Sequence, residues 1–308
     1  MNDHVIQTEG LTCYYGSRQV VAPLSFSVPR GCIYGFLGRN GAGKSTTIKM
    51  LLGLLEPTRG TSRLLGEPST AIRPETRAKV GYMGEGHFVY GWMTVRECGN
   101  FQRAFYPNWN QKIFETAVDY FGLHTDAVAK GLSRGERAGL CLALTLAPEP
   151  ELLILDDPAL GLDPVARRTL LQAMLFVTSD TERTVFFSSH ILADVERVAD
   201  RIAVLDRGVL RVDCAMDTFR ERVQQYALHF DGIPPKVTGV PGLLQSVCMD
   251  NEVLVTVANY GADTAASFER LNPTAVTKLS IGIEEAFVAY LGERGERGPF
   301  LSNLEGTK

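Results

Sequence analysis

Apolar and polar residues alternate in two segments near the start of the chain, 5–15 and 20–28. This alternation is typical of strands with one buried face, and the polar residues 16–18 between them predict an antiparallel pair. Three later runs are continuously apolar instead, at 32–37, 152–155 and 185–187, and a short strand is also expected at 80–83. Strands that are buried on both faces lose the alternation, so these runs predict a mainly parallel sheet.

Apolar residues recur at helical spacing in three segments in the middle of the chain, 95–105, 111–121 and 140–147. These segments predict a helical insert that spans about 86–147, between strands of the sheet. Another helix is expected to begin at Pro164, because proline is tolerated in the first helical turn, where an N–H group has no partner. The stretch 56–60 contains proline and glycine and is expected to interrupt regular secondary structure.

A smaller unit of mixed pattern follows residue 222. Its strands are predicted at 226–230, 243–249, 253–257 and 276–279, and its helices at 263–271 and 283–291. We therefore expect three parts: a large domain over 1–222, a small α+β domain over 223–292, and a polar tail over 293–308 whose composition predicts disorder.

The composition is that of an ordinary globular chain of 308 residues, with a net charge of −4 and an isoelectric point near 5.8. This balance gives no general basic field, so no nucleic-acid partner is expected. The six cysteines lie far apart and lack metal-ligand spacing, which favours a reducing compartment. The first residues lack the pattern of a signal peptide, and no long apolar run predicts a membrane-spanning helix. A cytoplasmic location is therefore expected.

A phosphate-binding pattern, G-x-x-x-x-G-K-[ST], occurs at 38–46. A predicted strand precedes it and apolar residues at helical spacing follow it, which a chance glycine-rich turn capped by Ser45 would lack. Glycine allows positive φ, so that successive N–H groups converge on phosphate oxygens at the positive end of a helix. Lys44 is expected to reach the β- and γ-phosphates and Ser45 to hold Mg²⁺. The expected nucleotide-binding residues here are Asn40, Gly41, Ala42, Gly43, Lys44, Ser45 and Thr46.

Two carboxylates, Asp156 and Asp157, directly follow the apolar run 152–155. In a phosphate-binding site, Asp156 is placed to hold Mg²⁺ and Asp157 to orient or deprotonate the attacking water. The alternative is a pair of solvated acids at a strand end, and the phosphate-binding loop upstream argues against it.

Five further motifs occur in an order that resembles the ABC-type ATPases, over about residues 5–213. The segment 131–136 (GLSRGE) resembles the signature sequence of that family, whose usual core is LSGGQ, and 159–164 (ALGLDP) resembles its D-loop. His190 resembles its switch histidine, Tyr15 the aromatic residue that stacks on adenine, and Glu85 stands at the Q-loop. Each motif alone has another interpretation: Ser133 and Glu136 as a helix capping box, His190 as a core histidine, and Tyr15 as a packed strand residue.

The resemblance implies an α/β fold of the P-loop NTPase class. This would be an ABC-type nucleotide-binding domain with a mainly parallel sheet core, an antiparallel β subdomain and a helical subdomain, followed by the small C-terminal α+β domain. ATP and Mg²⁺ are the implied cofactors, with Ser45, Asp156 and Glu85 as the residues that hold the metal.

The resemblance also implies a second ATP-binding subunit, either an identical copy or a paralogue. Ser133 and Gly135 of one chain would contact the γ-phosphate held by Lys44 of the other, and Asp163 would lie at the shared interface. His190 would bridge the γ-phosphate and the attacking water. The expected catalytic residues are Asp157, His190 and Glu85.

Three positions depart from the pattern of the family. Asp157 stands where the family normally has Glu and is one methylene shorter, so we expect slow hydrolysis of ATP. Glu85 replaces the common Gln and adds a negative charge, either as a functional difference or as a tolerated variant. Arg134 and Glu136 replace Gly and Gln in the signature sequence.

The expected function is to power transport, in the direction of export, by a separate integral membrane permease at the inner face of the cell membrane. The aromatic segment 86–97 follows the Q-loop, where the family docks its permease, although Phe88 and Trp92 could instead pack in the core. The ending 280–291 resembles the last helix of export-type subunits. The alternative is a slowly hydrolysing regulatory protein that uses ATP-driven dimerisation as a switch, for which Asp157 is the supporting feature.

Overall fold

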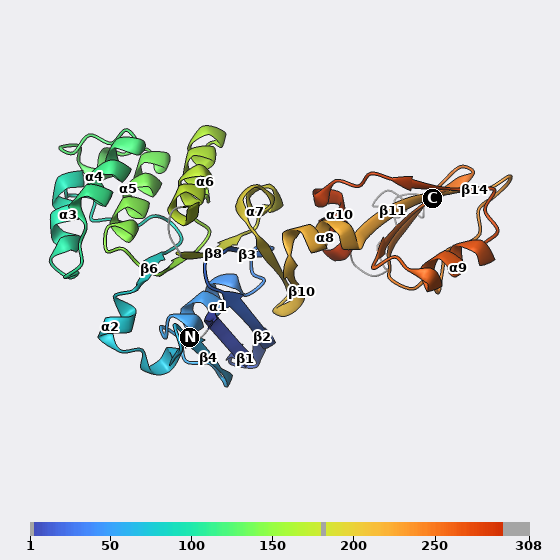
Figure 1. Ribbon diagram of the computed structural model, residues 1–308, viewed down its shortest axis with the longest axis horizontal. Coiled ribbons are helices and arrows are strands. Elements are labelled where there is room, and N and C mark those ends of the chain that lie inside the picture. The colour runs from blue at the N-terminus through green and yellow to red at the C-terminus, as the bar shows by residue number, and fades with distance from the viewer. Residues whose placement is uncertain (1–2, 180–182, 292–308) are drawn as a thin grey trace, which may run out of the picture. The chain divides into compact units, whose positions relative to one another are not determined.

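The structure of the protein is a computed structural model that describes residues 3–179 and 183–291 (Figure 1). The chain separates into two compact units, Met1–Met216 and Asp217–Lys308. The tail over 293–308 lies outside the described residues. Among the described residues, every helix is too short or too polar to span a bilayer.

A six-stranded sheet forms the centre of the first unit, in the order β10-β9-β3-β8-β7-β6. Its strands are β3 (Ile33–Gly38), β6 (Val80–Met83), β7 (Leu152–Leu155), β8 (Thr184–Ser189), β9 (Arg201–Asp206) and β10 (Val209–Ala215). All neighbours are parallel except the edge strand β10, which runs antiparallel to β9. Every residue of β3, β7 and β8 is buried, which confirms the prediction made from their continuous apolar runs.

The parallel strands bring the candidate residues to one edge of this sheet. The phosphate-binding loop follows β3, Asp156 and Asp157 follow β7, His190 follows β8, and Glu85 follows β6. The carboxyl ends of parallel strands meet at the same edge, which is where open α/β sheets bind their ligands.

A second, antiparallel sheet has the order β2-β1-β4-β5. It consists of β1 (His4–Tyr15), β2 (Arg18–Pro29), β4 (Arg59–Leu64) and β5 (Glu67–Pro68). Phe26 of β2 stacks on the rings of Tyr34, Phe36 and Phe186 in the central sheet, so the two sheets share one core.

The segment between β3 and β6 is partly as expected from the sequence. The helix expected after the phosphate-binding loop is α1 (Lys44–Leu51), and the chain turns after it at Gly53, which has φ 68°. The expected interruption of regular secondary structure at 56–60 ends at residue 58, since β4 begins at Arg59. Most of β4 is polar and exposed, so only its pairing with β1 reveals it as a strand.

Three helices form a subdomain with its own core: α3 (Val95–Arg103), α4 (Gln111–Tyr120) and α5 (Arg134–Leu146). In Figure 1 they lie on one side of β6, with β1, β2 and β4 on the other. The helix α5 begins at Arg134 rather than at 140, because Ser133 caps it. The remaining helices of the first unit are α2 (Pro74–Arg77), α6 (Pro164–Ser179), α7 (Leu192–Val198), η1 (Ser69–Ala71) and η2 (Ala129–Gly131), and α6 begins at Pro164 as predicted.

The second unit is a four-stranded antiparallel sheet, in the order β12-β13-β11-β14, with helices beside it. Its elements are α8 (Met216–Arg222), β11 (Val223–His229), β12 (Leu243–Met249), β13 (Glu252–Ala258), α9 (Ala262–Arg270), β14 (Ala275–Leu279) and α10 (Ile283–Leu291). Tyr226 and Phe268 pack edge to face in its core. The elements predicted from the sequence are all present, within three residues at each end.

Candidate active site

The phosphate-binding loop joins β3 to α1 in the conformation that its glycines allow. Gly41 has φ 78° and Gly43, which caps α1, has φ 106°. At Gly43 a Cβ would lie 2.9 Å from the carbonyl oxygen of Val20, so any side chain there would meet backbone. The N-terminal N–H groups of α1 lack partners within the helix and therefore favour an anion at this end.

Lys44 lies inside this loop. Its side chain is buried and donates hydrogen bonds to the carbonyl oxygens of Gly38 and Arg39, at 2.8 and 3.4 Å. Burial lowers the pKa of the ammonium group from its usual value, and the nearby carboxylates, Asp157 first, act in the opposite direction. A buried cation facing carboxylates is an arrangement that favours a polyphosphate bound through a divalent metal.

A chain of hydrogen bonds connects the loop to the two carboxylates after β7. The hydroxyl group of Ser45 donates to Asp156 Oδ1 at 3.1 Å, and the hydroxyl group of Ser188 donates to the same oxygen at 2.7 Å. The N–H group of Asp157 donates to Ser188 Oγ at 2.8 Å. Asp156 and Ser188 are buried, so this network holds the Asp156 carboxylate in one orientation.

Asp157 and His190 form the second pair of the site. Nδ1 of His190 donates to Oδ2 of Asp157 at 2.8 Å, which leaves Nε2 of the ring to face other groups. The backbone of Asp157 is left-handed, with φ 47°, and His87 Nε2 donates to the carbonyl oxygen of the next residue, Pro158, at 2.8 Å. The pair thus places a carboxylate and an imidazole beside each other, as a water-orienting site requires.

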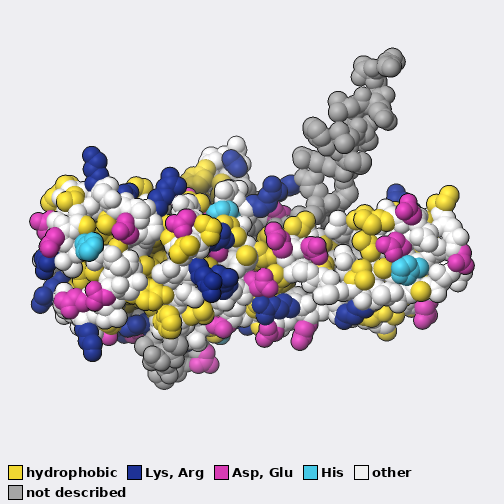
Figure 2. Space-filling view, turned by 90° about the horizontal axis from the view of Figure 1, so that it is seen from above, with side chains coloured by type: hydrophobic (Ala, Val, Ile, Leu, Met, Phe, Trp, Pro, Cys, Tyr) yellow, Lys and Arg dark blue, Asp and Glu magenta, His cyan; other side chains and the backbone are white. Residues whose placement is uncertain are grey.

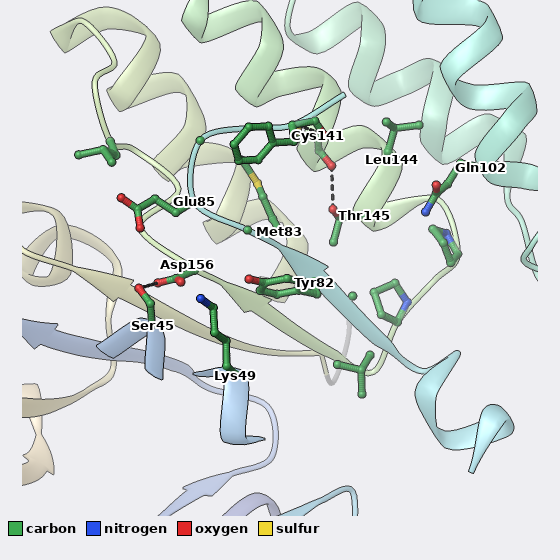
Figure 3. Close-up of a pocket in the computed structure, with 18 of the residues that line it drawn as sticks. Ser45, Lys49, Tyr82, Met83, Glu85, Gln102, Cys141, Leu144, Thr145 and Asp156 are labelled. Atoms are coloured by element: carbon green, nitrogen blue, oxygen red, sulfur yellow. Dashed lines mark hydrogen bonds between the residues drawn. The ribbon is translucent and has the colours of Figure 1, made fainter. Parts of the chain in front are cut away.

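Two cavities open at this edge of the sheet. The smaller, of about 210 Å³, is lined by Lys44, Glu85 and Asp157 together with the other members of its wall: Val20, Asn40, Gly41, Gly43, Ser45 and Thr46. The larger, of about 750 Å³, contains Ser45, Glu85 and Asp156 and extends along Tyr82 toward α3 and α5 (Figure 3). The predicted nucleotide-binding residues of the loop therefore line the smaller cavity, except Ala42, which is buried, while the larger cavity reaches beyond the site.

The donor set around Asp156 fits Mg²⁺. Ser45 and Asp156 offer oxygens that already lie within hydrogen-bond distance of each other, and Glu85 lines the larger cavity with both of them. Hydroxyl and carboxylate oxygens are the ligands that Mg²⁺ prefers, and it binds through one or two carboxylates together with substrate phosphates. The predicted metal-holding residues are thus brought together.

The signature sequence and the D-loop lie beside each other, at the starts of α5 and α6. Ser133 Oγ accepts the N–H group of Glu136 at 3.2 Å, and Glu136 Oε2 accepts that of Ser133 at 2.8 Å, so the capping-box interpretation is confirmed. Asp163 caps α6 through the N–H groups of its residues Val165 and Ala166. A Cβ at Gly135 would lie 2.6 Å from the Cβ of Ala166, so the starts of α5 and α6 pack closely.

These residues are not brought to the phosphate-binding loop of their own chain. Ser133, Gly135 and Asp163 line neither of the two cavities that contain Ser45 and Glu85. Tyr15 likewise lines neither cavity; it lies at the turn between β1 and β2 with 52% of its surface exposed.

The aromatic segment after Glu85 is exposed. The exposed fractions are 89% for Phe88, 54% for Tyr90 and 73% for Trp92, so the core-packing alternative for Phe88 and Trp92 was wrong. Tyr90 contacts Trp92 and Phe101, and Phe101 contacts Phe105, so exposed rings continue along α3. On the face drawn in Figure 2, Lys and Arg side chains are interspersed with Asp and Glu among the described residues.

Sequence reasoning assigned no role to Ser188 and His87. Ser188 lies two residues before His190, but its two partners follow another strand, 31 and 32 residues earlier. His87 contacts a carbonyl group 71 residues away, which no local pattern signals.

Comparison with known proteins gives consistent matches. A sequence profile of the ABC transporter family matches residues 21–160. Bacitracin transport ATP-binding protein BcrA of Bacillus licheniformis is 34% identical over 224 residues, which cover 72% of the chain and 73% of that protein. Daunorubicin/doxorubicin resistance ATP-binding protein DrrA of Streptomyces peucetius is 36% identical over 209 residues, which cover 66% of the chain and 63% of that protein.

Solved structures match over the same part of the chain. The ATP binding subunit of an ABC transporter superposes with a TM-score of 0.63 at 29% identity, over 70% of the chain and 92% of that protein. A bacterial Atm1-family ABC exporter with ATP bound has a TM-score of 0.62 at 23% identity, over 72% of the chain and 40% of that protein. The second similarity concerns the fold alone.

Proposed function

The chain belongs to the ABC transporter family, and from this membership we propose that it is an ATPase subunit that powers export by a separate membrane permease. ATP would be bound and hydrolysed between two nucleotide-binding units. The observation that carries this proposal is the grouping of Lys44, Asp156, Asp157 and His190 at one sheet edge, with Ser45 joining the loop to the carboxylates.

Each of these residues has a role that follows from its position. The loop and Lys44 bind the β- and γ-phosphates, with Glu85, Ser45 and Asp156 holding Mg²⁺. The metal neutralises charge on the phosphate oxygens when it is bound. Asp157 and His190 orient the attacking water, and Asp157 accepts its proton.

A second subunit completes the site in this proposal. Ser133, Gly135 and Asp163 gather at the starts of α5 and α6, apart from the cavity that contains Lys44. Two chains arranged head to tail would bring the Ser133 hydroxyl group and the positive end of α5 to the γ-phosphate held by the partner chain. Bound ATP would then favour the closed dimer, and hydrolysis would release it. Tyr15 would stack on the adenine ring.

The exposed aromatic segment supports a membrane partner. Phe88, Tyr90 and Trp92 are exposed next to Glu85, and contiguous exposed rings are typical of interaction sites. The relatives include a bacitracin transport protein and a daunorubicin/doxorubicin resistance protein. We infer from their names that the permease of this chain exports its substrate, and that the chain lies at the cytoplasmic face of the membrane through that permease.

Affinity purification from detergent-solubilised membranes of the native host tests this proposal. We expect a polytopic protein to co-purify with the tagged chain, and to be lost from the double variant Phe88→Ser/Trp92→Ser while ATP binding is retained. The matched control is Phe176→Ser, which changes an exposed ring on α6, outside the aromatic cluster that includes Phe88 and Trp92. Absence of any polytopic protein in the native sample would refute the transport role.

One observation favours a second candidate, an ATP-dependent switch that is not coupled to transport. Asp157 has a short side chain that is already bonded to His190, and a slow ATPase would remain in its ATP-bound dimer for longer. A soluble dimer that forms with ATP, turns over slowly and has no membrane partner would support this candidate. Size-exclusion chromatography with ATP and with ADP measures the dimer directly.

A further inference from the structure

The backbone at Asp157 has an unusual conformation. Its φ of 47° is left-handed, a region that side-chain-bearing residues rarely adopt, although Asp tolerates it better than most. Such a conformation persists only where the surroundings impose it. Since the side chain of Asp157 is short, the position of its carboxylate follows directly from this backbone.

One group that imposes the conformation is the Ser188 hydroxyl group at the end of β8. It accepts the N–H group of Asp157 at 2.8 Å and donates to Asp156 Oδ1 at 2.7 Å. Ser188 is fully buried, so water cannot replace either bond. One hydroxyl group thus fixes the backbone of Asp157 relative to the carboxylate of Asp156.

The second group is His87, on the other side of the same loop. Its Nε2 lies 2.8 Å from the carbonyl oxygen of Pro158, and because a carbonyl oxygen only accepts, Nε2 is the donor. His87 is buried and is itself left-handed, with φ 53°. The Asp157–Pro158 segment is therefore held at its N–H group by Ser188 and at its carbonyl group by His87.

We propose that Ser188 and His87 are positioning residues for ATP hydrolysis. They hold the Asp157–Pro158 backbone so that the short carboxylate of Asp157 stays hydrogen-bonded to Nδ1 of His190. This inference rests on the proposed function for its kinetic consequence. The geometric part, that the two residues set the Asp157 to His190 contact, does not need hydrolysis and is measured separately.

The geometric part is tested by NMR of the protein labelled in its five histidines, without nucleotide. In the native protein we expect His190 to carry its proton on Nδ1, because Asp157 Oδ2 accepts it, and the His190→Gln variant assigns that signal. Ser188→Ala and His87→Asn should reduce this Nδ1–H population. Asn tolerates the left-handed backbone but is too short to replace Nε2. Gln restores a donor while straining the backbone at φ 53°, so His87→Gln should restore most of the signal.

The kinetic part uses the same variants with a matched control. Thr184→Ala removes another fully buried hydroxyl group of β8, one that accepts the N–H group of Gly31 at 2.9 Å. We expect Ser188→Ala and His87→Asn to lower kcat about tenfold to 100-fold with KM for ATP unchanged, because a misplacement of about 1 Å costs roughly that much. His87→Gln and Thr184→Ala should stay near the native rate.

An Asp157→Ala background separates positioning from general damage. If Ser188 and His87 act through Asp157, removing either in that background should cause no further loss of turnover. The inference is overturned if the His190 signal is unchanged in both variants, or if Thr184→Ala lowers kcat as much as Ser188→Ala. A native protein that keeps the His190 signal but does not hydrolyse ATP would refute the proposed function and leave the geometric part standing. If Ser188→Ala fails to fold, the comparison of His87→Asn with His87→Gln tests the inference by itself.

Discussion

Lengthening the carboxylate at 157 should raise turnover. In Asp157→Glu the side chain gains one methylene, which extends it by about 1.5 Å. Asp157 lines the cavity beside Lys44, so the added length has room on that side. A misplacement of about 1 Å costs roughly 100-fold in rate, so a carboxylate that is short by about this much predicts an increase in kcat of up to ~100-fold.

The same substitution should lower stability. Glu lacks the tolerance of Asp for the left-handed backbone at φ 47°, and forcing a residue into this region costs roughly 1–2 kcal/mol. For a domain of this size, about 1 kcal/mol lowers the melting temperature by roughly 2–4 °C. Faster turnover together with a lower melting temperature is therefore the expected signature.

The assay is phosphate release at saturating ATP and Mg²⁺, alongside thermal unfolding of the same samples. Asp157→Asn is the matched control, because Asn keeps the backbone preference and the size but cannot accept a proton. We expect it to bind ATP with little turnover. A folded Asp157→Glu protein whose kcat is unchanged or lower would refute the reasoning that the shorter side chain limits the rate.

Three further predictions concern stability. Ser133→Ala removes the N-cap of α5 and should lower the free energy of unfolding by about 1 kcal/mol in urea; an unchanged midpoint would contradict the capping role. Gly139→Ala would place a Cβ 2.4 Å from Phe121 Cγ and should cost about 1–3 kcal/mol, whereas Gly131→Ala, with open space around it, should cost far less. Burial lowers the pKa of His87 from 6.5. As the pH falls below about 6.5, the His87 side chain is therefore protonated in the unfolded chain before it is protonated in the folded one, and the free energy of unfolding decreases. His87→Gln should therefore make the urea midpoint less sensitive to pH between about 7.5 and 5.5, and an equal slope in both proteins would contradict this assignment.

The parts of the site that follow from local sequence were predictable. The phosphate-binding loop needs glycines at fixed spacing, because its N–H groups must converge, and a strand buried on both faces needs a continuous apolar run. Both patterns involve residues that are close together in the sequence. The placement of Asp156 at the end of β7, beside Ser45, follows from the parallel order of the strands.

The parts that depend on distant pairing were not predictable. β4 has no apolar alternation, and only its backbone bonds to β1 define it. His87 looks like one polar residue in an aromatic segment, and its bond to Pro158 exists only once the loop after β6 is folded against the loop after β7. The exposure of Phe88 and Trp92 could not be read from their hydrophobicity, since apolar rings occur both in cores and at interaction sites.

The capping box at Ser133 is compatible with a role in binding phosphate. Ser133 Oγ accepts the N–H group of Glu136, which leaves the hydroxyl proton free to be donated to a phosphate oxygen. The carboxylate of Glu136, however, adds a negative charge at the helix end where the partner chain would present its γ-phosphate. Arg134 adds one positive charge in the same turn and reaches the carbonyl oxygen of Gly161 in the D-loop, at 3.4 Å. The two departures from the usual signature thus leave its net charge unchanged. Arg134→Gly alone should therefore weaken ATP-dependent dimerisation and Glu136→Gln alone should strengthen it, while the double variant should stay near the native protein.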